Sequence, residues 1–102
     1  MEIIRRVENN VAYLEISGRI DTITSGCFQQ QVTEVLGQEL RELVLDFGKV
    51  DYISSAGLRG LLVIAKFAGM REIPVIFTHV TGMVLEVLEM SGFDSFFMIK
   101  ES

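Results

Sequence analysis

The sequence predicts an α/β fold in which a mixed β-sheet of about five strands carries helices packed mainly on one face. Short apolar or alternating segments of strand length recur along the 102 residues, and segments with helical periodicity separate the later ones. A tight turn joins the first two expected strands, which favours antiparallel pairing. A helix precedes each of the other three strands, and such connections favour parallel pairing by right-handed crossover.

The start of the chain predicts a β-hairpin. Residues 1–7 mix apolar and basic side chains, as an edge strand does, and an Asn-Asn pair suits the turn that follows. Residues 12–17 alternate between apolar and polar side chains, which indicates a half-buried strand that stops at Gly18. The polar members of this alternation would lie on a sheet face that no helix covers: Tyr13, Glu15 and Ser17.

A helix is expected next. Apolar side chains at Phe28, Val32, Val35 and Leu36 have the spacing i, i+4, i+7 and i+8 of one helical face, and Gly37 is the expected stop. The candidates for its N-cap are Thr22, Thr24 and Ser25.

The second half of the chain predicts three strands and two helices in alternation. The strands are expected over residues 43–47, 74–79 and 96–99, and the helices over residues 58–68 and 83–90. The first of these helices is apolar almost all round. One side of this helix must cover the sheet, and its far side carries Val63, Ile64 and Phe67. We expect these three side chains to pack in the core; if they are exposed instead, they would mark a protein interface. The expected stops of these elements are Gly48, Gly69 and Gly92.

Composition predicts one cytoplasmic domain, residues 1–102. The hydrophobic fraction of 49% indicates a globular chain, and the net charge of −5 argues against non-specific binding to nucleic acid. The basic residues are scattered, which argues against an anionic membrane surface. The single Cys27 excludes an internal disulfide and fits a reducing cytosol. No signal peptide and no apolar segment near the ~20 residues of a membrane span are expected.

Catalysis has little support in the sequence. A nucleophilic serine needs a base, and the only histidine, His79, falls in an expected strand, where a structural role is commoner. Cys27 has no CxxC pattern or paired histidine, and Asp46 and Asp51 suit turns better than a metal pair. We therefore expect no enzymatic activity, no cofactor and no metal.

The most informative segment is the strand–loop–helix transition over residues 44–62. Ser54 or Ser55 occupies the position of a helix N-cap directly before an apolar run. A hydroxyl there satisfies free backbone N–H groups, and a phosphate there would meet a favourable helix dipole. Local spacing does not distinguish a cap from a modification site.

This segment resembles the signature of the anti-anti-sigma factors, small antagonist proteins built on the STAS domain. Their loop has the form Asp-Ser-Ser/Thr-Gly-Leu-Gly, and the serine after the aspartate is phosphorylated. Anchoring on Gly57 and Leu58 places Ser55 at the phosphoacceptor position, Ala56 at the second Ser/Thr, and Ser54 where many members carry aspartate. Two further segments resemble family motifs in the same order, Ile16-Ser-Gly-Arg-Ile-Asp21 and Leu88-Glu-Met-Ser-Gly-Phe93.

The resemblance implies a partner-binding surface around the serine loop. Asp21 would help to contact a kinase from a neighbouring loop, and it also suits a capping role. Arg59 lies one helical turn beyond Ser55, where it is either a solvated charge or a partner for a phosphate. The expected partner-binding residues are Asp21, Thr22, Ser54, Ser55, Ala56, Gly57, Leu58 and Arg59.

The resemblance also implies a function, that of an anti-sigma factor antagonist. With Ser55 unmodified, the protein would bind an anti-sigma factor with GHKL-type serine kinase activity and so free a sigma factor. Phosphorylation of Ser55 would release the complex, and a PP2C-type phosphatase would reset it. The alternative is a STAS module that scaffolds a signalling assembly or senses a ligand without phosphorylation. The missing aspartate before Ser55 keeps this alternative open.

Overall fold

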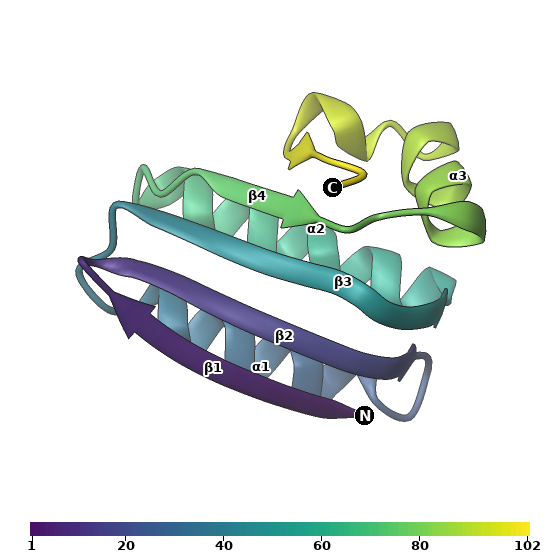
Figure 1. Cartoon of the computed structure of the whole chain (residues 1–102), viewed down its shortest axis with the longest axis horizontal. Coiled ribbons are helices and arrows are strands. Elements are labelled where there is room, and N and C mark those ends of the chain that lie inside the picture. The colour runs from purple at the N-terminus through teal and green to yellow at the C-terminus, as the bar shows by residue number, and fades with distance from the viewer.

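The computed structural model, which describes residues 1–102, contains one five-stranded sheet whose spatial order follows the chain, β1-β2-β3-β4-β5 (Figure 1). The strands are β1 (Glu2–Glu8), β2 (Val11–Ile20), β3 (Glu42–Ile53), β4 (Val75–Thr78) and β5 (Met98–Ile99). The hairpin pair β1–β2 is antiparallel, and the pairs β2–β3, β3–β4 and β4–β5 are parallel. The mixed sheet predicted from the turn and the crossover helices is therefore confirmed.

Helices cover one face of this sheet. The helices are α1 (Ser25–Leu36), α2 (Ser55–Met70) and α3 (Gly82–Met90), followed by the short 3-10 helix η1 (Phe93–Ser95). In Figure 1, α1 lies behind β1 and β2, α2 lies behind β3 and β4, and α3 stands beside the end of β4. Gly37 is the C-cap of α1, as predicted, and Gly92 follows α3 with a left-handed φ of 77°.

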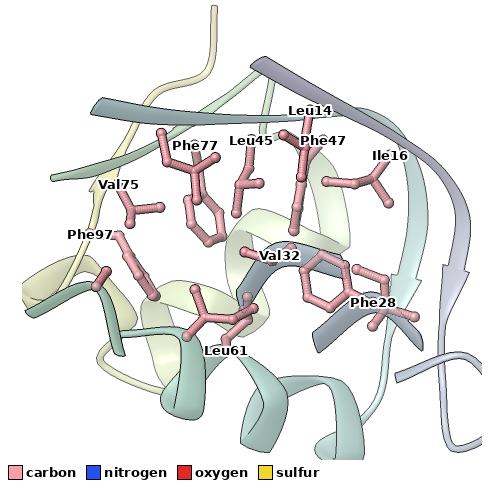
Figure 2. Packing of buried hydrophobic residues seen from close by; sticks show 14 of the residues in the cluster. Leu14, Ile16, Phe28, Val32, Leu45, Phe47, Leu61, Val75, Phe77 and Phe97 are labelled. Atoms are coloured by element: carbon pink, nitrogen blue, oxygen red, sulfur yellow. The ribbon is translucent and has the colours of Figure 1, made fainter. Parts of the chain in front are cut away.

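The core lies between the sheet and the helices as one cluster of 24 buried hydrophobic residues. Figure 2 shows alternate residues of the strands pointing into it, among them Leu14, Leu45 and Phe77. Phenylalanine rings continue through this layer: Phe47 lies 6.3 Å from Phe28 of α1 and 4.9 Å from Phe77 of β4, measured between ring centroids. These spacings suit edge-to-face and offset contacts, so the rings tie α1 to the middle of the sheet.

The other face of the sheet is not covered by a helix. Tyr13, Glu15 and Ser17 are half-buried on it, as the alternation predicted. Asp46 and His79 also lie on this face, where their side chains are 3.1 Å apart.

The predicted stops at Gly18 and Gly48 are wrong. β2 continues to Ile20 and β3 to Ile53, because the two strands stay paired through Gly18–Val50 and Ile20–Ile53. The register shifts along this stretch mark β-bulges, and Gly18 has a φ of +102°. Glycine here permits a bulge within a strand and does not end it.

Three other boundaries also differ from the prediction. α2 passes Gly69 and ends at Met70, since a single glycine costs a helix only about 1 kcal/mol. β4 ends at Thr78, so that His79 lies beyond the strand with a φ of 57°. β5 contains only Met98 and Ile99, because the N–H groups of Phe96 and Phe97 donate to the carbonyl oxygen of Phe93 in the turn that closes η1.

The apolar helix α2 shows which of its sides faces the core. Ile64 is fully buried and Phe67 is half-buried, whereas Val63 is 41% exposed. Leu61 is fully buried, whereas Leu62 is 38% exposed. Because α2 packs against both α1 and the sheet, its buried arc is set by two neighbours and includes Ile64 in place of Leu62.

Candidate functional site

Two loops meet where β2 and β3 end side by side. Ile20 and Ile53 are paired at the ends of these parallel strands, and the backbone N–H of Ser54 donates to the carbonyl oxygen of Ile20 at 2.9 Å. The loop that leads into α1 and the loop that leads into α2 therefore start from adjacent positions. This brings together the two segments that the sequence assigned to partner binding, around Asp21 and around Ser55.

Ser54 is the N-cap of α2. Its backbone is extended, with φ −92° and ψ 174°, and its Oγ accepts a hydrogen bond from the N–H of Gly57 at 3.2 Å. Its carbonyl oxygen accepts from the N–H of Leu58 at 2.9 Å, the first hydrogen bond of the helix. The geometry therefore decides a question that spacing left open, because one serine has the capping role and the other does not.

Ser55 is the first residue of α2, and its side chain is exposed. The first turn of α2 contains no acidic side chain, so nothing negative there compensates the positive end of the helix dipole. Arg59 is also exposed, one turn further along the same helix. A negative group added at Ser55 would meet the dipole, the free N–H groups of the first turn and this guanidinium.

Gly57 fixes the position of this turn against the sheet. A Cβ atom at Gly57 would lie 2.7 Å from Cγ1 of Ile53 and 2.9 Å from Cγ2 of Ile20, and it would lie 3.0 Å from the carbonyl oxygen of Ile20. These distances are shorter than normal contacts, so only glycine lets the helix approach the strand ends this closely. Ala56 and Leu58 on either side are half-buried.

Asp21 organises the loop before α1. Its Oδ1 accepts hydrogen bonds from the N–H groups of Ile23 at 3.0 Å and Thr24 at 3.1 Å. In return, Thr24 Oγ1 accepts from the N–H of Asp21 at 2.9 Å. This reciprocal pattern resembles a capping box, so Asp21 caps the turn that leads into α1, while Thr24 is the N-cap of the helix itself.

The same hydrogen bonds stabilise the charged form of Asp21. The backbone N–H of Thr24 is the main reason that the pKa of this carboxyl lies below its ordinary value. The N–H of Ile23, the hydroxyl of Thr24 and the charge of Arg19, whose Nε lies 3.7 Å from Oδ2, lower the pKa further, while partial desolvation opposes them. A fixed negative charge therefore lies in the loop beside the Ser55 helix.

The family of the chain follows from a match over nearly its whole length. The family model of the STAS domain matches residues 2–102. The chain belongs to the STAS domain family. Three motifs in the sequence pointed to this family, and the match confirms it.

The curated relatives of this STAS domain are named as antagonists of anti-sigma factors. It is 34% identical over 96 residues to BtrV of Bordetella bronchiseptica, a candidate anti-sigma factor antagonist, with 82% of this chain and 83% of BtrV covered. It is also 34% identical over 61 residues to the anti-sigma-F factor antagonist RsfB of Mycobacterium tuberculosis. That match covers 60% of this chain and 50% of RsfB.

Solved structures share the fold of this STAS domain. A candidate anti-sigma factor antagonist of Thermotoga maritima superposes with a TM-score of 0.89 at 17% identity, over 98% of this chain and 86% of that one. SpoIIAA in its unphosphorylated form gives a TM-score of 0.76 at 11% identity, over 99% and 89% of the two chains. The phosphorylated form of Bacillus SpoIIAA gives 0.73 at 13% identity, over 96% and 90%.

The STAS domain also exposes an apolar residue that sequence reasoning missed. Ile23 lies between Asp21 and Thr24 in the loop before α1, and its side chain is 90% exposed. Thr22 beside it is exposed as well. An isolated apolar residue within a polar turn, off any helical face, was the signal that could have identified Ile23.

α2 extends this exposed surface away from Ser55. Ser55, Arg59, Leu62 and Lys66 lie at spacings of three or four residues, so they form one stripe along the helix. Val63 beside them is exposed too, unlike Ile64 and Phe67. The stripe combines apolar, basic and hydroxyl side chains on one exposed side of α2, and arginine is among the residues enriched at protein interfaces.

The histidine lies on a different face from the serine loop. Nδ1 of His79 is 3.1 Å from Oδ1 of Asp46, in the middle of β3 on the uncovered face of the sheet. Ser55 begins α2, beyond the end of the same strand and on the helical side. The structure therefore does not place His79 as a base for Ser55.

No helix has the length and apolar character needed to cross a membrane.

Proposed function

We propose that this STAS domain, residues 1–102, is an anti-sigma factor antagonist that works without catalysis, by exchanging partners under the control of phosphorylation at Ser55. The observation that carries the proposal is the different placement of the two serines. Ser54 caps the helix through the N–H of Gly57, whereas Ser55 is exposed at the first residue of α2. The relatives named as anti-sigma factor antagonists support the same role.

In the unmodified form, the exposed surface of both loops and of α2 would bind an anti-sigma factor. The partner has GHKL-type serine kinase activity and sits over Asp21, Thr22 and Ile23 on one side and over Ser55 and the helical stripe on the other. The exposed side chain of Ile23 supplies apolar surface that is buried away from water on binding. Asp21 supplies a fixed charge for a basic group of the partner. Binding keeps the anti-sigma factor away from its sigma factor.

Phosphorylation would break this complex through the surface alone. A phosphate adds about 1.5–2 negative charges at a point where a small hydroxyl had packed against the partner. Arg59 and the free N–H groups at the start of α2 hold the phosphate on this protein, so no helix or strand needs to move. Each loss of about 1.4 kcal/mol at the interface weakens binding tenfold. A PP2C-type phosphatase then restores the binding form. SpoIIAA, which has this fold, exists in both forms.

The experiment compares the partners of wild type, Ser55→Asp and a charge-matched control. Ser91→Asp introduces the same charge at an exposed residue on the C-terminal side of α3. Wild type and Ser91→Asp should capture the same kinase from a lysate of the source organism, and Ser55→Asp should lose it while melting normally. Adding ATP to the wild-type complex should increase the mass of this STAS domain by that of one phosphate group. Fragmentation mass spectrometry should then locate the phosphate on Ser55.

Two results would overturn the proposal. One is a phosphate on Ser54, or none on Ser55, after incubation with the captured kinase. The other is equal capture by wild type and Ser55→Asp.

A third variant, Ser55→Ala, should stay bound to the captured kinase in the presence of ATP, because it cannot be phosphorylated.

The alternative, a ligand-sensing STAS module without phosphorylation, is favoured by one feature. A shallow cavity of about 490 Å³ lies on the uncovered sheet face, away from the serine loop. Its lining includes Tyr13, Arg6 and His79. Retained partners with Ser55→Asp, together with a thermal shift in the presence of a small metabolite, would support this role.

A further inference from the structure

β1 presents a free strand edge. It pairs with β2 on one side only, and Figure 1 shows it at the lower margin of the sheet with no element beyond it. Six of its seven residues are exposed. The outward N–H and C=O groups of such an edge form a template for another strand. The question is which strand fits it.

The sequence of β1 is complementary to itself along five residues in one antiparallel register. If two copies meet about a two-fold axis through Ile4, residues whose numbers sum to eight lie opposite each other. Glu2 then faces Arg6 of the second copy, and Arg6 faces its Glu2. Ile4 faces Ile4. Opposite charges and apolar pairs directly across two antiparallel strands are stabilising.

The neighbouring registers lack this match. Along an edge strand, only every second residue points its N–H and C=O groups outward. Residues directly opposite each other must be of the same kind, so two copies can form a symmetric antiparallel pair only when the two-fold axis passes through a residue. An axis through Arg5 places Arg5 against Arg5 and Glu2 against Glu8. An axis through Arg6 places Arg6 against itself. Like charges directly opposite destabilise a pair of strands. An axis through Val7 does pair Arg6 with Glu8, but it overlaps only three residues of β1.

The side chains that would meet lie on one face. Within the hairpin, Glu2 pairs with Ser17, Ile4 with Glu15 and Arg6 with Tyr13, and these partners lie on the uncovered face. Ile4 is apolar and yet 61% exposed there, beside the cavity that it helps to line. A second copy would cover it. Arg5 points to the opposite side, where it contacts Glu34 of α1 at 3.4 Å.

We propose that β1 is a dimerisation strand, and that two copies of this chain join through it into one continuous ten-stranded sheet. The contact consists of backbone hydrogen bonds, the Ile4 pair and two Glu2–Arg6 ion pairs. Arg6 exchanges its present contact with Glu8 for Glu2 of the second copy. The dimer leaves the Ser55 surface free, because β2 separates β1 from the strand that leads into α2.

The test uses charge reversal with rescue, on protein whose purification tag is at the C-terminus. Glu2→Arg should place its new positive charge against Arg6 of the second copy, and Arg6→Glu should create the equivalent acidic clash. Each variant alone should dimerise at least tenfold more weakly than wild type in sedimentation equilibrium. An equimolar mixture of the two should form a heterodimer with wild-type affinity, because both cross-strand pairs are then opposite in charge. Glu86→Arg and Lys66→Glu, at positions on α3 and α2 away from β1, should dimerise as wild type does.

Three results would overturn the proposal. The first is a wild-type protein that is monomeric up to millimolar concentration, which would show that the charges of β1 protect the edge. The second is a dimer that neither reversal weakens. The third is a mixture that remains monomeric although both variants melt as wild type does. The mixture distinguishes a lost interface from a lost fold, since a misfolded variant cannot be rescued by a second one.

Discussion

Replacing Gly57 by alanine is expected to destabilise the protein at the point where the serine helix meets the sheet. The new Cβ would lie 2.7 Å, 2.9 Å and 3.0 Å from atoms of Ile53 and Ile20. Overpacking of this kind costs about 1–3 kcal/mol. The gain in helix propensity offsets about 1 kcal/mol of this cost. One of the three atoms is the carbonyl oxygen that accepts the N–H of Ser54, so it cannot move away without weakening that bond.

Subtracting the propensity gain leaves a net loss in the free energy of unfolding of about 0–2 kcal/mol, and the fixed carbonyl oxygen favours the upper half of that range, about 1–2 kcal/mol. A loss of that size lowers the melting temperature of this domain by on the order of 4–16 °C. Urea denaturation and thermal melts measure both. Gly60→Ala is the matched control, because Gly60 is also buried one turn further along α2 and an added Cβ there would have no neighbour closer than 3.8 Å. The control should be neutral or more stable by up to about 1 kcal/mol. If the two variants change stability alike, close packing at Gly57 is not what positions the helix.

Two further predictions concern the loops on either side. Ser54→Ala should lower the free energy of unfolding by about 1 kcal/mol, because it removes the N-cap. Ser55→Ala should stay within about 0.5 kcal/mol of wild type, because the side chain it removes is exposed. Equal losses for the two variants in urea denaturation would contradict the assigned roles. Asp21→Asn should flatten the pH dependence of stability in acid. The folded pKa of Asp21 lies below its unfolded value, so its contribution is present above about pH 4 and is lost as the pH falls through the folded pKa. Wild type should therefore lose more stability than Asp21→Asn on acidification from about pH 5, and parallel profiles would refute this role.

The candidate site was only partly predictable from the sequence. Motif spacing selected the two loops, and parallel pairing of the strands before them explains why they lie together. The local signal for Ile23 was an apolar residue within a polar turn, but its exposure depends on what packs over the loop, and only the tertiary structure shows that. The stripe on α2 was also unresolved, because a helix that is apolar almost all round has no periodicity to show which side faces out.

The sequence by itself determined the order and type of the strands and α-helices, since period-two and period-3.6 patterns are local properties of the backbone. It also determined that the first strand pair is antiparallel and the others parallel, because connection length limits how strands can pair. Only the tertiary structure decided where β2 and β3 end. Gly18 and Gly48 are stops for an isolated segment, but each strand continues while its neighbour supplies hydrogen bonds.

The same distinction applies to the two serines. Both suit a helix N-terminus, and their local preferences are equal. The tertiary structure decided between them, because the carbonyl of Ile20 holds the backbone of Ser54 and the side chains of Ile20 and Ile53 leave room only for glycine three residues later. The contacts with Ile20 join residues more than thirty positions apart, and they fix where α2 begins. Ser54 is thereby turned toward the helix and Ser55 toward solvent.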